Sequence, residues 1–275
     1  MLCIQATPMV FRMFRKIPLL LVLLLPLASM AATPAPAVVR QAMSKIAAGL
    51  PVTNIGPAPI PGFYQALVQG RMVYVSHDGK YVMAGVLFDA EAPRNLTEAR
   101  MRSIRREALA TIPLSDKLVY APPHPKYTIT VFTDLDCPYC RVFHQHMAQY
   151  NAEGIAVQYL FWPRTGLKSV PSGRDTPSYR KAISVWCAKD RKQAFTDAKL
   201  GQSVPEATCP NPVAREYRLG ESIGVDATPT IIAEDGSMIS GYLPPAELLH
   251  VLRENRARGQ SAGPGGVDPD AASRH

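Results

Sequence analysis

The sequence predicts a protein of mixed α and β structure, with a small α+β unit followed by a larger α/β domain that carries a helical insertion. Two observations lead to this prediction. From residue 126 onwards, short apolar runs typical of strands alternate with segments of helical periodicity. Before that point, Asp78-Gly79 lies between two β-rich runs and predicts a hairpin turn. At 275 residues, the chain is long enough for one large domain or two ordinary ones.

The N-terminus predicts export rather than a folded element. Three basic residues precede the apolar run IPLLLVLLLPLA, and the small-residue stretch ASMAA follows it. This is the pattern of a signal peptide, residues 1–31, with cleavage near Ala31. A transmembrane anchor is the alternative, but the run is shorter than the roughly 20 residues that span a bilayer. We therefore expect an exported protein; whether translation starts at Met1, Met9 or Met13 stays open.

Charge and composition argue against a nucleic-acid partner. The formal net charge is +8, and removal of residues 1–31 takes away three basic residues and no acidic ones. The remaining excess is typical of a solvated surface. Cleavage also removes Cys3, leaving Cys137, Cys140, Cys187 and Cys209. Four cysteines in an exported protein indicate disulfide chemistry.

The segment before residue 126 predicts a small unit and a connector. Residues 36–50 have one apolar helical face, and residues 62–90 contain the hairpin at Asp78-Gly79. A unit of residues 34–95 buries little core, and pairing with a second copy through its strand edges is one remedy. We expect a dimerisation domain there. Residues 96–125 predict a linker helix, with Asn95 as N-cap, and a proline-rich hinge.

The larger domain is predicted over residues 126–258. Its strands are expected in YTITVF and AVQYLFW, and a hairpin is expected in PTIIAEDGSMISGY with its turn at Asp235-Gly236. Helices are predicted in CPYCRVFHQHMAQYNAEG, SYRKAISVWCAKD, KQAFTDAKLG, NPVAREYRLGESIG and PPAELLHVLRENRARG. Residues 259–275 are small and polar, and predict a disordered tail.

The stretch Cys137-Pro138-Tyr139-Cys140 allows three interpretations. A zinc site would add His144 and His146, but two residues apart on a helix they point to different faces, so each is expected to be a surface residue and no metal is predicted. A purely structural disulfide would close a very small loop and so stabilise little. A redox pair agrees best with a strand that runs into a helix start.

The redox interpretation has a physical mechanism. At the first turn of a helix, unpaired N–H groups and the helix dipole favour an anion, so the pKa of the Cys137 thiol should fall. Pro138 suits the first helical position because its missing N–H has no intrahelical partner there. Cys140, one turn further in, should be less exposed, titrate higher and attack a mixed disulfide on Cys137. Asp134 and Asp136 could either raise the Cys137 pKa or cap the helix, and Tyr139 is either a substrate contact or a surface aromatic.

Two further features lie outside that motif. Thr228-Pro229 stands just before a predicted strand, where a cis peptide bond could present the preceding backbone to a substrate chain. Cys187 lies in a helix and Cys209 in a proline-rich turn, with 21 residues between them. A bridge between them would stabilise the helical insertion by ~3 kcal/mol, so we expect a structural disulfide.

On these residues the chain resembles the periplasmic disulfide isomerases DsbC and DsbG. The matching stretches cover nearly all of the chain after the signal: IGPAPIPGFYQAL, VSHDGKYVMAG, ITVFTDLDCPYC, MAQYNAEGIAVQYLFWPRTGL, SVWCAKDRKQAF and GVDATPTIIAEDGSMISGYLPP. The resemblance implies a thioredoxin-like catalytic domain after a cystatin-like dimerisation domain. It also implies a V-shaped homodimer and no cofactor.

The resemblance assigns roles to the residues singled out above. It makes Cys137 the nucleophile, Cys140 the resolving cysteine and Thr228-Pro229 the cis-proline loop. We take Pro138, Tyr139, Thr228 and Pro229 as the candidate substrate-binding residues. The resemblance also matches Cys187 and Cys209 to a structural pair of the DsbC branch. The implied partners are misfolded exported proteins with non-native disulfides and a membrane thiol reductase of the DsbD type.

The two branches of this family leave the specificity open. The dipeptide Pro138-Tyr139 is associated with DsbG, whereas the context of Cys187 and Cys209 favours DsbC. We expect a disulfide isomerase/reductase that rearranges non-native disulfides. The alternatives are a DsbG-like reductase of sulfenylated cysteines, a dithiol oxidase, and a holdase chaperone that needs no cysteine.

Overall fold

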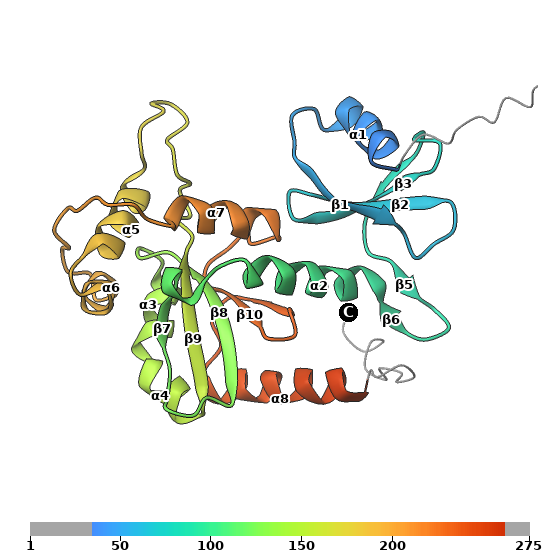
Figure 1. Cartoon of the computed structure of the whole chain (residues 1–275). Helices are drawn as coiled ribbons and strands as arrows, with labels where there is room; N and C mark the ends of the chain where they lie inside the picture. The colour runs from blue at the N-terminus through green and yellow to red at the C-terminus, as the bar shows by residue number, and fades with distance from the viewer. Residues whose placement is uncertain (1–34, 262–275) are drawn as a thin grey trace, which may run out of the picture. The chain divides into compact units, whose positions relative to one another are not determined.

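The computed structural model describes residues 35–261, so the predicted signal peptide lies outside the described residues. Within this range the chain has mixed α and β structure, as predicted (Figure 1). A four-stranded sheet near the N-terminus has the order β1-β2-β3-β4, and a five-stranded sheet has the order β11-β10-β8-β9-β7.

The N-terminal unit is one helix packed on an antiparallel sheet. It consists of α1 (Ala35–Ile46), β1 (Val52–Pro57), β2 (Phe63–Val68), β3 (Arg71–Ser76) and β4 (Val82–Ala84). Alternate residues of β2 and β3 point to one face, and these pack against α1 in a cluster that includes Val39, Met43, Ala66, Val73 and Val75. The predicted hairpin at Asp78-Gly79 is confirmed, because β3 and β4 pair across it.

Strand β1 was not foreseen from the sequence, for a physical reason. It carries a register irregularity between Thr53 and Gly56, and Asn54 has a positive φ of 51°. A bulge of this kind disrupts the two-residue alternation that identifies a strand in a sequence. Its Asn, Gly and Pro residues are also those that usually indicate a turn.

The connector begins with a short two-stranded ribbon, β5 (Phe88–Asp89) with β6 (Arg94–Asn95), and continues as α2 (Leu96–Ala110). Asn95 caps α2 as predicted, because its side chain accepts a hydrogen bond from the Glu98 amide. After the 3-10 turn η1 (Leu114–Asp116), β7 (Leu118–Tyr120) pairs with β9. The segment predicted as linker therefore also supplies an edge strand to the second sheet.

The larger unit has a mixed sheet with helices on both faces. Its elements after β7 are β8 (Tyr127–Thr133), α3 (Pro138–Gln145), α4 (Met147–Ala152), β9 (Ile155–Phe161), α5 (Pro177–Cys187), α6 (Arg191–Lys199), α7 (Val213–Ser222), β10 (Thr230–Ala233), β11 (Met238–Ser240) and α8 (Pro245–Ser261). β8 and β9 are parallel, and the other neighbouring pairs are antiparallel.

Side-chain alternation along the strands divides the core into two layers. One face of the sheet packs against α3 to α6 and α8 in a cluster that includes Ile129, Val131, Tyr159, Phe143, Phe195 and Leu248. The other face, with Phe132, Leu160 and Ile232, packs with Met101 and Ile104 of α2 and with Ile223 after α7. Helix α2 is also attached to the β10–β11 turn, since Arg102 pairs with Asp235 at 3.1 Å.

One predicted helix is wrong in its extent. The segment 137–154 was expected as a single helix, but it breaks at His146 into α3 and α4. The His146 ring contacts the Val142 carbonyl at 2.9 Å, while the His146 amide bonds to Phe143 instead. A side chain that competes for the i−4 carbonyl in this way interrupts the helical ladder. Helix α8 extends to Ser261, past residue 259 where the tail was predicted to begin, and the rest of that predicted tail, residues 262–275, lies outside the described part.

Candidate active site

The two cysteines of the central motif lie where β8 ends and α3 begins. Cys137 is the N-cap of α3, with an extended backbone (φ −74°, ψ 121°), and Pro138 occupies the first turn. The unpaired amides at the start of α3, among them that of Cys140, therefore favour a negative charge on the Cys137 sulfur. Cys140, one turn further along, is 1% exposed. Both are free thiols.

The sheet register brings the cis-proline loop to the same place. β10 runs antiparallel to β8, with Thr230 opposite Phe132, so the start of β10 lies beside the end of β8. The Thr228-Pro229 peptide bond is cis and immediately precedes β10. The Cys137 thiol donates a hydrogen bond to the Thr228 carbonyl at 3.2 Å. Segments about 90 residues apart in sequence thus meet at one sulfur atom.

The surroundings separate the acidities of the two thiols. The hydrogen bond from Cys140 is the largest cause that lowers the pKa of Cys137 to about 5, and the positive charge of Arg164 acts in the same direction. Burial and the hydrogen bond to Cys137 raise the pKa of Cys140 far above its ordinary value. At neutral pH, Cys137 is therefore the thiolate and Cys140 the thiol, which is the division of roles that thiol–disulfide exchange needs.

The two aspartates before Cys137 stabilise loops rather than cap the helix. The Asp134 carboxylate is buried and accepts hydrogen bonds from the backbone amides of Asp136 and Arg164, each at 2.7 Å. It also accepts one from Ser178 at 3.2 Å. Asp136 pairs instead with Lys181 and with Arg141. Asp134 therefore ties the β8–α3 loop to the segment that brings Arg164 near Cys137.

Beneath the two thiols lies a buried polar layer that sequence reasoning missed. His144 was expected at the surface, but it is 8% exposed, and its two ring nitrogens contact Tyr159 at 3.3 Å and Thr196 at 3.1 Å. Burial lowers its pKa to about 4. Lys199 is also buried, and donates to Thr133 at 2.7 Å. The available sequence signal was its position four residues after Phe195, on the apolar stripe of α6.

Tyr139, Cys187 and Cys209 are the other residues that were predicted to have a role, and only Tyr139 lies next to the two reactive cysteines. Tyr139, between the two cysteines, is 66% exposed, so its ring is accessible to a partner. Cys187, the last residue of α5, and Cys209 are joined by a disulfide. That bond connects the helical insertion to the turn before α7.

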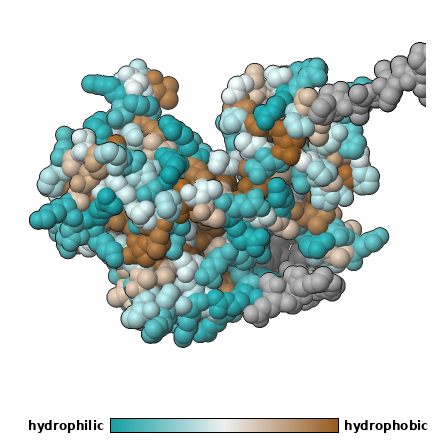
Figure 2. Space-filling model, viewed as in Figure 1, coloured by the Kyte–Doolittle hydropathy of each residue, from teal (hydrophilic) through white to brown (hydrophobic). Residues whose placement is uncertain are grey.

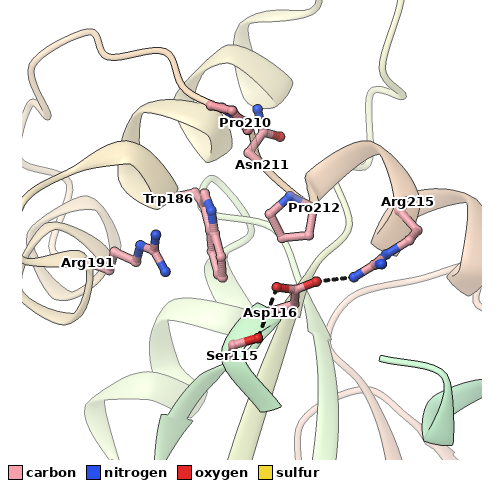
Figure 3. Close-up of a pocket in the computed structure, with 8 residues that line it drawn as sticks. All are labelled: Ser115, Asp116, Trp186, Arg191, Pro210, Asn211, Pro212 and Arg215. Carbon is pink, nitrogen blue, oxygen red and sulfur yellow. Dashed lines mark hydrogen bonds and ion pairs between the residues drawn. The ribbon is translucent and has the colours of Figure 1, made fainter. Parts of the chain in front are cut away.

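A cavity of about 520 Å³ lies beside that disulfide, away from Cys137 (Figure 3). Its polar lining is already paired: Asp116 contacts Ser115 and Arg215, and the Arg191 guanidinium lies 4.0 Å from the Trp186 ring centroid. Reactive groups do not converge in it, so we place the active site at the cysteines. Within residues 35–261, no three His, Cys, Asp or Glu side chains are grouped as a metal site would need.

Comparisons with known proteins agree with this site. A family model described as the disulfide bond isomerase protein N-terminal domain matches residues 30–98, and one described as a thioredoxin-like domain matches residues 114–256. The thiol:disulfide interchange protein DsbC of Escherichia coli K12 is 36% identical over 222 residues, which are 80% of this chain and 88% of the relative. The chain belongs to the DsbC family.

Other relatives extend this result. The DsbC of Dickeya dadantii is 35% identical over 229 residues, covering 82% of this chain and 90% of the relative. A solved disulfide interchange protein from Neisseria gonorrhoeae is 31% identical, covers 53% of this chain and 99% of its own, and superposes with a TM-score of 0.44. The family assignment therefore rests on the sequence matches. By this membership the protein is a thiol:disulfide oxidoreductase of the disulfide isomerase type.

The surface of the molecule is mixed in character. Polar and apolar residues alternate over the face shown in Figure 2, with scattered apolar patches. Among the described helices, none combines the length and the apolar character that a bilayer-spanning segment requires.

Proposed function

We propose that this protein rearranges non-native disulfides through Cys137 and Cys140. The observation that carries the proposal is the geometry at one helix start: Cys137 caps α3 with its sulfur 3.2 Å from the Thr228 carbonyl oxygen, and Cys140 lies buried one turn further in. The Cys137 thiolate attacks a substrate disulfide, forms a mixed disulfide and releases one substrate thiolate. A second substrate thiol then displaces Cys137 in a new pairing, or Cys140 displaces the substrate and leaves it reduced.

Substrate binding is proposed around the exposed edge of this site. Tyr139 presents an exposed ring beside Cys137, and the Thr228 carbonyl oxygen lies 3.2 Å from the Cys137 sulfur. When Cys137 is the thiolate, this carbonyl is free to accept a hydrogen bond from the backbone of an extended substrate chain whose sulfur contacts Cys137. Contacts to backbone carry no sequence code, which suits an enzyme that acts on many misfolded exported proteins.

The test is recovery of activity by scrambled ribonuclease A. We expect wild type to accelerate recovery, Cys137→Ala to be inactive, and Cys140→Ala to retain part of the activity while accumulating mixed disulfides. Cys140→Ala losing all activity while Cys137→Ala stays active would overturn the assignment. The Pro138-Tyr139 dipeptide favours a second function, reduction of protein sulfenic acids, so the same variants should be assayed on a sulfenylated protein.

We also propose a periplasmic homodimer. Support comes from the predicted signal peptide and from β4, which is the last strand in its sheet and can add a strand from another chain. Tyr81 and Met83 are apolar side chains exposed there, at 67% and 45%. Met83→Asp should shift the sedimentation coefficient to that of a monomer. Leu200→Asp, at a comparably exposed apolar position (57%), should leave it unchanged.

The remaining partner is proposed from the chemistry. Isomerisation needs Cys137 as a free thiolate, so a donor must reduce any Cys137–Cys140 disulfide that forms. A membrane thiol reductase of the DsbD type would supply these electrons in the periplasm. In cells without such a reductase, the pair should accumulate as a disulfide.

A further inference from the structure

A buried lysine lies beneath the active site without an ionic partner. Lys199, the last residue of α6, is 2% exposed, and its ammonium group donates to the Thr133 hydroxyl at 2.7 Å and to the Asp134 carbonyl at 2.9 Å. Among residues 35–261, it forms no ion pair with a carboxylate. Burial of an unpaired charge is costly, and a lysine in such a place readily gives up its proton.

One hydroxyl group connects this lysine to the resolving cysteine. The Thr133 side chain that accepts from Lys199 is also a hydrogen-bond partner of the Cys140 sulfur. Cys140 is 1% exposed, so water has little access to its proton. The Thr133 hydroxyl therefore lies between the Cys140 sulfur and the Lys199 amine, where it can relay a proton from one to the other.

The charged and titratable groups around Lys199 come from two segments. Helix α3 contributes Cys137, Cys140, Arg141 and His144, and the loop after β8 contributes Asp134. Burial, together with the nearby Arg141, lowers the pKa of Lys199 to about 8, against the opposing effect that Cys140, Asp134 and Cys137 exert when they are ionised. Both the amine and the ammonium form are therefore present near neutral pH.

We propose that Lys199 takes up the proton of Cys140 through the Thr133 hydroxyl, and so controls how fast Cys140 resolves a mixed disulfide on Cys137. This rests on the proposed roles of the two cysteines. Lys199 does not contact the substrate, so it is a positioning residue for the known reaction. The rate of this resolution decides whether the substrate is reduced or isomerised. Fast resolution by Cys140 releases a reduced substrate, and slow resolution gives the substrate time to rearrange its disulfides.

The step balances as follows. The Cys140 S–H gives its proton to the Thr133 oxygen while the Thr133 O–H gives its own to the neutral Lys199 amine. The resulting thiolate attacks the Cys137 sulfur, the Cys137–Cys140 bond forms, and the bond from Cys137 to the substrate sulfur breaks. The substrate sulfur leaves with the electron pair and takes a proton from solvent. The enzyme dithiol is thereby oxidised by two electrons, and the substrate disulfide is reduced.

Charge balance explains why a lysine suits this place better than a carboxylate. Before the transfer, a neutral amine and a thiol lie buried together; after it, an ammonium lies near a thiolate. The buried group carries no net charge in either state, so the transfer avoids an isolated buried charge. A carboxylate would begin as an unpaired anion and would repel the developing thiolate.

The test separates the two chemical steps with one chromophore. Reduced wild-type protein reacts with 5,5′-dithiobis(2-nitrobenzoate): attack by Cys137 releases the first thionitrobenzoate, and resolution by Cys140 releases the second. We expect the second phase to accelerate with pH, with a midpoint near the Lys199 pKa of about 8. In Lys199→Met, the second phase should slow by about 10²-fold at pH 7 and lose that midpoint, while the first phase keeps its rate.

Two matched sets of variants distinguish a proton acceptor from a fixed charge or from simple packing. Lys199→Arg keeps a cation that does not deprotonate, so it should be as slow as Lys199→Met. Thr133→Val should slow the second phase and Thr133→Ser should restore it, which tests the connection even if the Lys199 variants fold poorly. An unchanged second phase in Lys199→Met, or a wild-type rate in Lys199→Arg, would overturn the proposal. Loss of the first phase in wild type would instead refute the role of Cys137.

Discussion

The two cysteine pairs of this chain differ in their places in the fold. Cys137 and Cys140 occupy the N-terminal turn of α3, next to the cis-proline loop, and both are free thiols. Cys187 is the last residue of α5 and is bonded to Cys209, 22 positions away. The same side chain is therefore acidified at a helix start and used as a crosslink at a helix end.

The difference shows that local backbone and neighbours, rather than burial alone, decide the use of a cysteine. Cys137 and Cys140 are both nearly inaccessible, yet their pKa values shift in opposite directions. At Cys137 the hydrogen bonds, above all the one from Cys140, outweigh burial, whereas at Cys140 burial outweighs the favourable effects of Lys199 and Thr133. The Cys187–Cys209 bond, by contrast, stabilises the fold by restricting the unfolded chain.

The largest effect is expected when the two pairs are disabled separately. Cys137→Ser should reduce disulfide isomerisation to the uncatalysed background, because it removes the attacking thiolate. Cys187→Ala with Cys209→Ala should retain most of the isomerase activity at 25 °C. Assays of scrambled ribonuclease A with both variants measure this, and equal losses would contradict the separation of roles.

The structural pair should contribute mainly to stability. Replacing both Cys187 and Cys209 by alanine should lower the free energy of unfolding by about 3 kcal/mol. The melting temperature should then fall by roughly 10 °C for a domain of this size. Thermal denaturation followed by circular dichroism provides the measurement. The control is Cys137→Ala with Cys140→Ala, which should stay within a few degrees of reduced wild type.

The reactive pair should show its depressed acidity directly. The rate of Cys137 alkylation by iodoacetamide should rise with pH with a midpoint near the pKa of about 5. The pKa of Cys137 in the folded protein lies below its ordinary value of 9.0. The thiolate therefore adds to the free energy of unfolding of the reduced protein, and this contribution is complete at pH values above 9.0. This stability is lost as the pH falls toward 5. A midpoint above pH 8 would show that the helix start does not activate this thiol.

The smallest effect is expected at the exposed dipeptide. Tyr139→Ala should raise KM for a protein substrate by a few fold and leave kcat nearly unchanged, because the ring is exposed and does not touch the reacting sulfurs. Tyr139→Phe keeps the ring and serves as the control. If neither variant changes KM, Tyr139 is only a surface aromatic.

Much of the fold was accessible from the sequence because its signals are local. The Asp78-Gly79 and Asp235-Gly236 turns, the Asn95 cap and the alternation of strands and helices each depend on a few neighbouring residues. The break at His146 and the bulged β1 were missed, because a side chain or a bulge overrides periodicity there. Three-residue β7 is too short to show any alternation.

The site was only partly accessible, for a different reason. The motif around Cys137 can be recognised from the spacing of its two cysteines, and Thr228-Pro229 can be recognised from its position just before a predicted strand. Lys199 and Thr133 are 66 positions apart and meet only in the folded chain. His144 was misplaced because two neighbouring histidines resemble a surface pair until the packing of Phe195 and Tyr159 around the ring is known.

The most direct test of this account is the redox state of all four cysteines in living cells. Thiols are trapped with a mass-tagged maleimide, and the peptides that contain each pair are then separated and weighed. The account predicts two tags on the Cys137–Cys140 peptide and none on the peptides joined by Cys187 and Cys209. An oxidised Cys137–Cys140 pair would contradict it and make this protein a donor of disulfides rather than an isomerase.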